Sequence, residues 1–435
     1  MANARQVAFE ALLKTEKNNA YSNIALDVIL SKARLDTRDK AFVSALFYGA
    51  IERKLTIDYQ LSRYLSKPLK KLKTEVLVIL ELGAYQILFM DKVPDSAAVN
   101  ESVTLAKKNG YTFASGLINA VLRKVAANGI VLPDEKNLIA HLSIRYSCPE
   151  EYIALWLKEL GRDNTVGLLE STLGSAEINI RVNTTVINCD SLIEFLKNEG
   201  VTAEKTDLEN ALSLSLDGKD IETLESFKKG YFHVQDLSCQ LCAKALGAKA
   251  GDRVFDMCSA PGGKAFTVAQ YMNDSGEVLC FDLHQSRVDL IKGGAERLLL
   301  KSVKAQVGNA SEYDGKLGYA DAVLCDVPCS GLGIIRRKPE IKYKSLDSLK
   351  ELPDIQYKIL QNASQYVKSG GTLLYSTCTV LKRENEYVCR KFLNNNPEFE
   401  SIAALPEITD DKFITLLPHK NGGDGFFIAV FKRKG

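Results

Sequence analysis

The sequence predicts an α/β protein in three parts: an all-helical N-terminal domain, a small α+β module, and a doubly wound α/β domain on a parallel sheet. Two observations predict this. In the first 130 residues, apolar side chains recur three and four positions apart, which is the period of amphipathic helices. From Arg253 onward, short apolar runs alternate with helical stretches, as in a parallel sheet covered by helices. A chain of 435 residues is long enough for two or three domains.

The predicted helical domain spans residues 1–135. Its amphipathic stripes are separated by polar residues, and strand-like alternation is nearly absent. The segment Gly129–Pro133 breaks the helical pattern, so we place the domain boundary just after it. The stripes consist of Val7, Ala8, Ala11 and Leu12; Phe42, Ala45, Leu46 and Gly49; Val99, Val103 and Ala106; and Leu117, Ile118, Val121, Leu122 and Val125.

Residues 136–245 are predicted to form a linker and a small α+β module. Pro149 suits the first turn of a helix that runs to Leu160. The run Ile178–Asn183 alternates apolar and polar side chains, which is typical of a strand. The stretch Ser191–Gly200 has the pattern of a helix that ends on glycine.

Residues 246–435 are predicted to form the doubly wound domain. Its last expected strand, Phe426–Phe431, follows a turn that is rich in glycine. The preceding strands end in polar residues, and the carboxyl ends of parallel strands meet at one edge of a sheet, where ligands bind. The expected strands are Val254–Phe255, Val278–Phe281, Val303–Val307, Ala322–Cys325 and Thr372–Tyr375.

Charge is distributed unevenly along the chain. Residues 1–140 hold 20 Lys and Arg against 14 Asp and Glu, a net charge of +6. Because the whole chain carries +2, the remainder carries −4. A basic N-terminal third fits contact with nucleic acid, since clustered cations neutralise phosphates. A solvated charge imbalance explains the same numbers equally well.

The N-terminus and the cysteines indicate the compartment. The sequence MANARQVAFE enters a helical pattern directly, so we expect no secretion signal and a cytoplasmic protein. The longest apolar stretch, Val76–Met90, is interrupted by Glu81 and is too short to span a membrane. We therefore expect the ten cysteines to be reduced thiols. The pair Cys239 and Cys242 has no second pair to complete a zinc site, so we expect no metal.

A glycine-containing loop follows the first strand of the C-terminal domain, in the segment Asp256–Lys264. Its sequence is DMCSAPGGK, and its paired glycines let the backbone approach a ligand closely. The pattern matches neither the dinucleotide fingerprint nor the phosphate loop. It indicates a loop for a nucleoside-type cofactor, with a tight strand-to-helix turn as the alternative.

Polar residues also end the next two strands. Asp282 lies 26 residues after Asp256, at the end of the second strand, where an acid typically bonds ribose hydroxyls. An exposed acid at a strand end is as good an interpretation of Asp282 taken alone. Asn309 follows the third strand and is placed to face an adenine ring.

Two cysteines follow the fourth and fifth strands. The fourth strand ends in Asp326-Val-Pro-Cys329, and the fifth ends in Ser-Thr-Cys378. A single cysteine is more often a small buried apolar residue than a nucleophile. Two thiols and a carboxylate at the ligand-binding edge of adjacent strands favour covalent catalysis. The motif geometry does not rank the two cysteines.

Several segments together resemble the Sun/Fmu (NOL1/NOP2) family of RNA cytosine-C5 methyltransferases. The N-terminal third is similar to NusB, a helical RNA-binding protein, and the combination is similar to bacterial 16S rRNA methyltransferases. Asn309 departs from the family, which commonly has Asp there. The segments that carry the resemblance are DMCSAPGGK, DVPCSGLGIIRRKPEIKY, LLYSTCT, GGDGFFIAVFKR and GYFHVQD for the methyltransferase, and RDKAFVSALFYGAIERK and GLINAVLRK for NusB.

The resemblance implies a class I, Rossmann-like methyltransferase domain that uses S-adenosylmethionine. In this family Cys378 would add to cytosine C6, Asp326 would hold N3 and the amino group, and Cys329 would assist release of the product. The implied partner is 16S rRNA, bound by a monomer. The cofactor would contact Cys258, Ser259, Ala260, Pro261, Gly262, Gly263, Lys264, Asp282, Asn309 and Asp326.

Three alternatives remain open from the sequence. A tRNA or another RNA would suit the same chemistry. A DNA cytosine methyltransferase would use Cys329 as its nucleophile, although the Thr-Cys378 motif and the NusB-like third argue against it. A non-catalytic RNA-binding protein would need neither the cysteine pair nor the cofactor loop. Finally, the basic run Arg336–Lys338 is placed either to meet RNA phosphates or to be a solvated loop.

Overall fold

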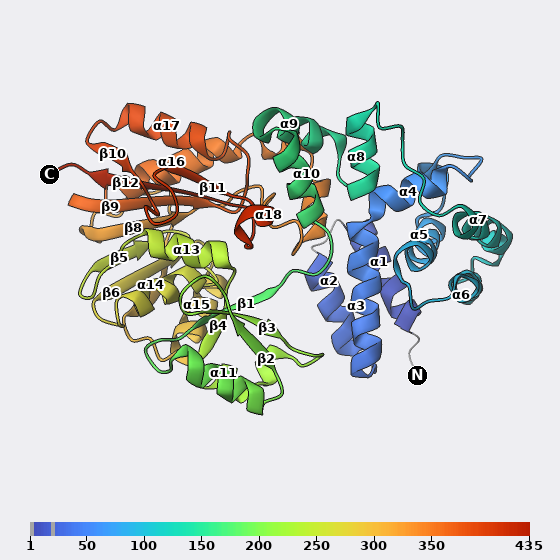
Figure 1. Ribbon diagram of the computed structural model, residues 1–435, viewed down its shortest axis with the longest axis horizontal. Coiled ribbons are helices and arrows are strands. Elements are labelled where there is room, and N and C mark those ends of the chain that lie inside the picture. The colour runs from blue at the N-terminus through green and yellow to red at the C-terminus, as the bar shows by residue number, and fades with distance from the viewer. Residues whose placement is uncertain (1–3, 19–21) are drawn as a thin grey trace. The chain divides into compact units, whose positions relative to one another are not determined.

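The computed structural model describes residues 4–18 and 22–435, and the chain divides into two units (Figure 1). One unit is helical and consists of Met1–Leu173 together with Lys338–Lys344. The other consists of Gly174–Arg337 and Ser345–Gly435 and contains the strands. No helix among the described residues has the length and apolar character needed to cross a bilayer.

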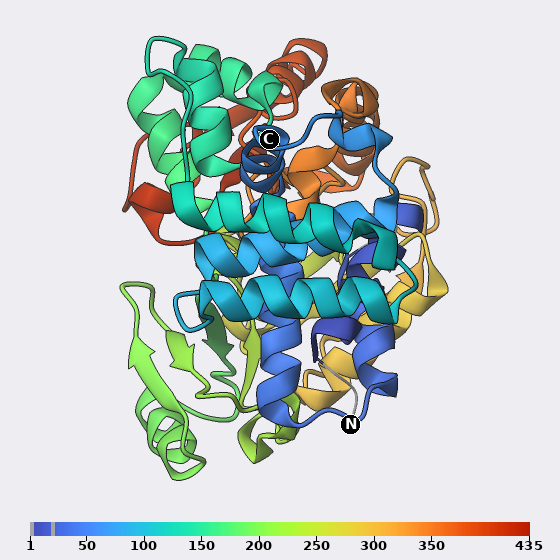
Figure 2. The same cartoon turned by 90° about the vertical axis from the view of Figure 1, so that its right-hand side faces the viewer.

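The helical unit buries most members of the apolar stripes that the sequence predicts, whereas Ala45 and Leu117 are exposed. Val7, Leu46, Val99 and Val125 all lie in one apolar core. Helices α5, α6 and α7 pack against one another at the face shown in Figure 2. The helices of this unit are α1 (Ala4–Asn18), α2 (Ser22–Lys32), α3 (Thr37–Glu52), α4 (Lys54–Ser62), η1 (Leu69–Lys71), α5 (Thr74–Phe89), α6 (Asp95–Lys108), η2 (Thr112–Ala114), α7 (Ser115–Asn128), α8 (Leu138–Tyr146), α9 (Glu150–Leu160), α10 (Arg162–Ser171) and η4 (Pro339–Tyr343).

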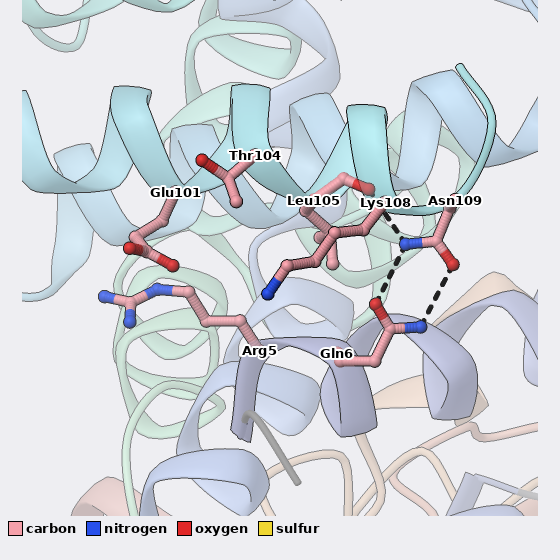
Figure 3. A pocket seen from close by; sticks show the side chains of 7 residues that line it. All are labelled: Arg5, Gln6, Glu101, Thr104, Leu105, Lys108 and Asn109. Carbon is pink, nitrogen blue, oxygen red and sulfur yellow. Dashed lines mark hydrogen bonds between the residues drawn. The ribbon is translucent and has the colours of Figure 1, made fainter. Parts of the chain in front are cut away.

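Side-chain hydrogen bonds join α1 to the end of α6. Gln6 Nε2 donates to Asn109 Oδ1 at 3.0 Å, and Asn109 Nδ2 donates back to Gln6 Oε1 at 2.9 Å (Figure 3). A polar groove of about 340 Å³ runs beside this pair, between Arg5 of α1 and Glu101 and Lys108 of α6. The reciprocal amide bonds fix the register of the two helices.

A short segment from the second half of the chain completes the helical unit. Tyr343 Oη donates to Ile51 O at 2.7 Å, and Lys342 Nζ donates to Glu52 O at 2.6 Å. Lys342 is fully buried, and this burial lowers its pKa to about 8. Tyr152 Oη also donates to Lys344 O. The C-terminal end of helix α3 is therefore hydrogen-bonded to Lys342 and Tyr343, which follow it in the sequence by 290 and 292 positions, respectively.

We expect Tyr343→Ala to loosen the helical unit. The half-buried ring packs against the helical core, so its removal should cost about 2–3 kcal/mol of stability. Tyr343→Phe keeps the ring, loses only the bond to Ile51 O, and should cost about 1 kcal/mol. Amide hydrogen exchange in α3 of the full chain measures both. Unchanged protection in Tyr343→Ala would contradict a supporting role for this segment.

A small antiparallel sheet opens the second unit. Its strand order is β2-β3-β1-β4, and its core contains Ile180, Leu192 and Phe232. The predicted strand at Ile178–Asn183 is confirmed as β1, and the predicted helix at Ser191–Gly200 as α11. The elements are β1 (Ile178–Val182), α11 (Cys189–Asn198), β2 (Thr202–Lys205), β3 (Ala211–Ser215), η3 (Ile221–Thr223), α12 (Glu225–Lys228) and β4 (Phe232–Val234).

The main sheet has the strand order β10-β12-β9-β8-β5-β6-β7, with β11 paired to β12. Strands β7, β6, β5, β8 and β9 are parallel, and β12 is antiparallel to β9. The chain order reverses between β5 and β8, which is the switch point where such sheets bind ligands. The strands are β5 (Arg253–Asp256), β6 (Glu277–Asp282), β7 (Val303–Val307), β8 (Ala320–Asp326), β9 (Val367–Thr377), β10 (Phe399–Ile402), β11 (Phe413–Leu416) and β12 (Phe426–Arg433).

Helices cover both faces of this sheet, so the doubly wound prediction is confirmed (Figure 1). Alternate residues of each strand face opposite cores: Val254 packs with Ala265 and Ile291, whereas Phe255 packs with Leu360. Because both faces of the sheet are buried, the strands appear in the sequence as short apolar runs. The helices are α13 (Leu237–Ala245), α14 (Gly263–Tyr271) and α15 (Gln285–Arg297) on one side, α16 (Leu352–Ser364) and α17 (Glu386–Asn395) on the other, and η5 (Leu346–Leu349) and α18 (Pro418–Asn421) in the connections.

Candidate active site

The loop between β5 and α14 is shaped by backbone bonds. Ser259 N donates to Phe281 O of the neighbouring strand at 2.8 Å, and Gly262 N donates to Ser259 O at 2.7 Å. Gly262 has φ +108°, and a Cβ there would lie 2.4 Å from the ring of Phe266. Only glycine fits this position. The loop therefore folds back tightly and presents the amino end of α14 at the carboxyl edge of the sheet.

The acid at the end of β6 is held in place from two sides. Asp282 is 6% exposed, its Oδ1 accepts from His284 N at 3.1 Å, and its Oδ2 lies 3.3 Å from Arg287 Nη1. The exposed-acid interpretation of Asp282 is therefore wrong, because the carboxylate is buried and oriented. A buried carboxylate at this strand end suits bonding to hydroxyl groups.

Asn309 follows β7 and lines a small cavity. The cavity has a volume of about 60 Å³ and lies between residues such as Phe281, Asn309 and Tyr366. The Asn309 amide donates to Glu312 Oε1 at 2.7 Å, and its oxygen accepts from Ser311 N at 3.0 Å. Both polar ends of the amide thus have local partners, and the side chain remains exposed to solvent.

Lys264 and Asp326 form an ion pair near the switch point. Lys264 Nζ lies 2.6 Å from Asp326 Oδ2, and Ser376 Oγ donates to Asp326 Oδ1 at 2.9 Å. Burial acts to lower the pKa of Lys264, but Asp326 together with Cys239 and Cys242 raises this pKa well above its ordinary value. Lys264 therefore stays charged, and both oxygens of Asp326 are positioned by bonds from different elements.

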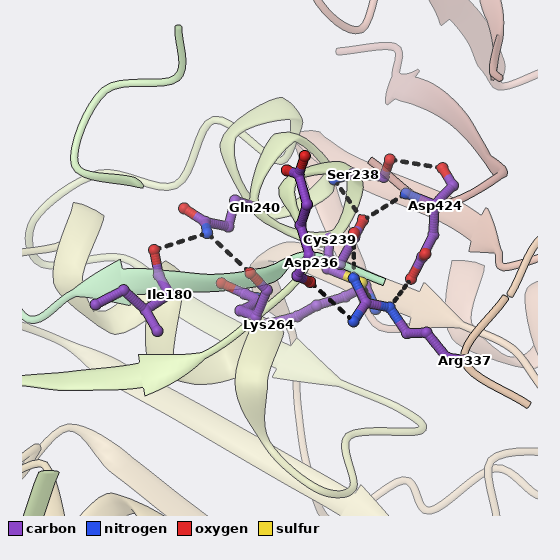
Figure 4. Close-up of polar contacts among 10 residues, drawn as sticks. Ile180, Asp236, Ser238, Cys239, Gln240, Lys264, Arg337 and Asp424 are labelled. Atoms are coloured by element: carbon purple, nitrogen blue, oxygen red, sulfur yellow. Dashed lines mark hydrogen bonds and ion pairs between the residues drawn. The ribbon is translucent and has the colours of Figure 1, made fainter. Parts of the chain in front are cut away.

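Arg337 is held by two carboxylates (Figure 4). Its Nε lies 2.6 Å from Asp424 Oδ2, and its Nη2 lies 2.9 Å from Asp236 Oδ2. Asp236 ends the GYFHVQD segment, and Asp424 belongs to the turn before β12. The side chain of Arg337 is thus ion-paired and 28% exposed, so it is not a freely solvated cation; a phosphate contact of the run Arg336–Lys338 stays a prediction. The Arg337 guanidinium ties three distant segments of the unit together.

The two cysteines at the ends of β8 and β9 face each other. The Sγ atoms of Cys329 and Cys378 lie 3.2 Å apart, and both thiols are free and half-buried. Their loops are joined by the bond from Ser330 Oγ to Thr379 Oγ1 at 2.8 Å and by the bond from Gly333 N to Cys378 O at 2.9 Å. The predicted convergence of the two thiols is thus present in the structure.

The Cys378 thiol affects the acidity of Cys329. Its hydrogen bond with Cys378 raises its pKa well above the ordinary value for a thiol, and burial adds to this effect.

Two buried polar residues that the sequence reasoning missed support the Cys329 loop. Glu384 Oε2 accepts from Ser330 N and from Gln356 Nε2, each at 2.9 Å. Gln356 Nε2 also donates to Pro328 O at 3.0 Å. Glu384 and Gln356 are both fully buried. Their spacing in the sequence carries no motif, so only the fold shows that they bracket the peptide bonds beside Cys329.

The two cysteines of the CxxC pair have different surroundings. Cys242 is buried in an apolar core, and Cys239 Sγ lies 3.5 Å from Lys264 Nζ (Figure 4). Among residues 4–18 and 22–435, no group of three His, Cys, Asp or Glu side chains is arranged to hold a metal ion.

Comparisons with known proteins cover nearly the whole chain. Residues 243–432 match the family "16S rRNA methyltransferase RsmB/F", and residues 2–127 match the NusB family. The probable ribosomal RNA small subunit methyltransferase B of Bacillus subtilis is 35% identical over 99% of both chains. The protein of the same name from Synechocystis is 32% identical over 100% of both chains.

One solved structure is similar over the full length of the chain. The crystal structure of PH0851 covers 100% of this chain and 99% of its own, with 26% identity and a TM-score of 0.83. The resemblance carried by the cofactor loop, the two cysteine motifs and the helical N-terminal third is therefore confirmed. The chain belongs to the RsmB/F family of 16S rRNA methyltransferases and carries an N-terminal region of the NusB family.

Proposed function

We propose that this protein transfers a methyl group from S-adenosylmethionine to carbon 5 of a cytosine in 16S rRNA, through a covalent bond between Cys378 Sγ and cytosine C6. The family and the names of its relatives support small-subunit rRNA as the substrate. The cysteine pair, with a sulfur separation of 3.2 Å, supports covalent chemistry. The remaining residues of the site fit the demands of that chemistry.

The residues at the carboxyl edge fit S-adenosylmethionine. The buried Asp282 carboxylate suits the two ribose hydroxyls, and Asn309 beside the small cavity suits the edge of an adenine. The glycine turn at Gly262 and Gly263 leaves the backbone of the loop Cys258–Lys264 free of bulky side chains. When bound, S-adenosylmethionine supplies an electrophilic methyl group and leaves as a neutral thioether.

The cytosine ring needs activation, because its carbon 5 is a weak nucleophile. Addition of the Cys378 thiolate to C6 breaks the C5–C6 double bond and makes C5 electron-rich, with the developing charge taken up at N3. After methylation, loss of the C5 proton restores that double bond and expels Cys378 as a thiolate. A group near N3 and a group that receives the C5 proton are therefore both required.

One observation favours Cys378 over Cys329 as the nucleophile. The hydrogen bond with Cys378 and burial both raise the pKa of the Cys329 thiol well above its ordinary value, which disfavours Cys329 as the thiolate that attacks C6. Once Cys378 is bonded to carbon, the larger cause of the raised Cys329 pKa is removed. The Cys329 thiol can then release its proton to solvent, and the resulting thiolate can accept the proton from C5. The two thiols thus act in sequence.

Asp326 suits the group near N3. Lys264 and Ser376 each hold one of its oxygens, so the carboxylate cannot rotate freely. A carboxylate fixed beside the thiols can bond N3 and the amino group of a flipped cytosine. The base has to leave its stack to reach a site at the sheet edge, so an unpaired rRNA segment is the favoured target.

We expect Asp282→Ala to weaken cofactor binding by roughly 10- to 100-fold, the usual worth of hydrogen bonds to a charged group. Calorimetry with S-adenosylmethionine measures this directly. Asp289→Ala is the matched control, because it removes an exposed acid from the helix that follows Asp282. Equal affinity of wild type and Asp282→Ala would remove Asp282 from the cofactor site.

The helical N-terminal region is proposed to bind rRNA and to position it for the catalytic domain. Its net charge of +6 over residues 1–140 and its match to the NusB family support this role. Methyl transfer from labelled cofactor to rRNA, followed by bisulfite mapping, tests the function as a whole. Labelled rRNA with no bisulfite-resistant cytosine would contradict methylation at carbon 5.

A further inference from the structure

A lysine-rich surface lies at the start of α5 in the helical unit. Four lysines, Lys67, Lys70, Lys71 and Lys73, occur within seven residues, and the stretch from Tyr59 to Thr74 contains no acid. All four lysines are exposed. Between them, Leu69 and Leu72 pack against the helical core and turn the lysines outward. The positive charge is thus fixed on one short, anchored segment.

An exposed aromatic ring lies against this segment. Phe113, in the 3₁₀ helix η2, is 71% exposed, whereas the adjacent Ala114 is 3% exposed. Lys73 Nζ lies 5.3 Å from the centre of the Phe113 ring, which is a cation–π contact. The centre of the Tyr111 ring lies 6.3 Å from that of Phe113. Two segments forty residues apart therefore place a phenyl ring beside a lysine cluster.

We propose that Phe113 and the Lys67–Lys73 segment form a binding surface for single-stranded RNA. An exposed ring offers a face on which an unpaired base can stack, and lysines beside it neutralise the adjoining phosphates. Duplex RNA buries its base faces in its own stack and cannot use the ring in this way. The proposal rests on RNA as the partner of this protein and assigns the place and the strandedness of that contact.

Binding of labelled RNA to the full chain, measured without cofactor, tests the surface. The probe is a mixed-sequence single-stranded oligonucleotide, compared with a hairpin in which the same sequence is paired. Phe113→Ala should weaken binding of the single strand about five- to tenfold, with little change for the hairpin. Lys70→Ala with Lys71→Ala should weaken binding. For this double variant, the plot of log affinity against log salt concentration should also have a shallower slope. The slope should fall in magnitude by about 0.7 for each phosphate that the protein no longer neutralises.

Two further ring variants separate base stacking from apolar contact. Phe113→Trp keeps an aromatic face and should retain affinity. Phe113→Leu keeps an apolar side chain but loses the face, and should bind as weakly as Phe113→Ala. If Phe113→Leu binds RNA like wild type, stacking is excluded and the surface suits apolar contact with a protein instead.

Matched controls come from the amino-terminal edge of the main sheet, in the other unit. Lys249→Ala with Lys316→Ala removes two exposed lysines, and Tyr319→Ala removes a 64% exposed ring; all three residues precede the amino ends of β5 or β8. These variants should bind RNA like wild type. Losses equal to those of the Phe113 and lysine variants would overturn the proposal. Because no methyl transfer is measured, the result stands whether or not the proposed chemistry holds.

Discussion

Replacing Cys329 with alanine should leave rRNA joined covalently to the protein. In this variant Cys378 can still add to cytosine C6 and the methyl group can still be transferred, but no neighbouring thiolate can form to take the C5 proton. The methylated adduct should therefore collapse slowly and accumulate. It is seen as a protein–RNA band that survives a denaturing gel, with rRNA labelled and S-adenosylmethionine present.

Cys378→Ala should show the opposite behaviour. Without the thiol that forms the bond, the variant should be inactive and leave no band, and the double variant should also leave none. Cys189→Ala, which removes another half-buried thiol from the same unit, serves as the control and should behave like wild type. Trapping by Cys378→Ala and none by Cys329→Ala would assign the nucleophile to Cys329. Full activity of either single variant would reduce that cysteine to a packing role.

Asp326→Asn should lower kcat by about 10²- to 10⁴-fold, the usual contribution of a positioned acid or base. The amide keeps the shape of the carboxylate but cannot match the charge that Lys264 presents at 2.6 Å. Turnover is measured at saturating rRNA and saturating cofactor, so that losses of binding do not enter. Circular dichroism of the variant checks that the buried Lys264 charge has not unfolded the domain.

Ser376→Ala is the matched control for Asp326. It removes only the bond to Asp326 Oδ1 and leaves the ion pair with Lys264 in place. We expect a loss of kcat of about tenfold or less, the worth of one hydrogen bond. If Asp326→Asn and Ser376→Ala lost the same small amount of activity, the carboxylate would not act on the cytosine ring.

The sequence alone determined the helices and strands, and the edge of the sheet at which the candidate functional residues lie. Helical stripes such as Ile118–Val125 and the strand Ile178–Val182 follow from local periodicity, because burial of one face imposes a period of 3.6 or 2. The ends of parallel strands meet at one edge. The order of the motifs therefore places Asp282, Cys329 and Cys378 at a common edge of the sheet.

The tertiary structure alone decided how those residues are held. No periodic pattern in the sequence indicates the 3.2 Å distance between the two sulfurs or the hydrogen bonds of Glu384 and Gln356 to the Cys329 loop. The same holds for the ion pairs of Arg337. The insertion of Lys338–Lys344 into the helical unit is equally hidden. These are pairings between distant segments, fixed by the need of each buried polar group for a partner. Local propensity and spacing record which side chains are polar; the fold determines which of them meet.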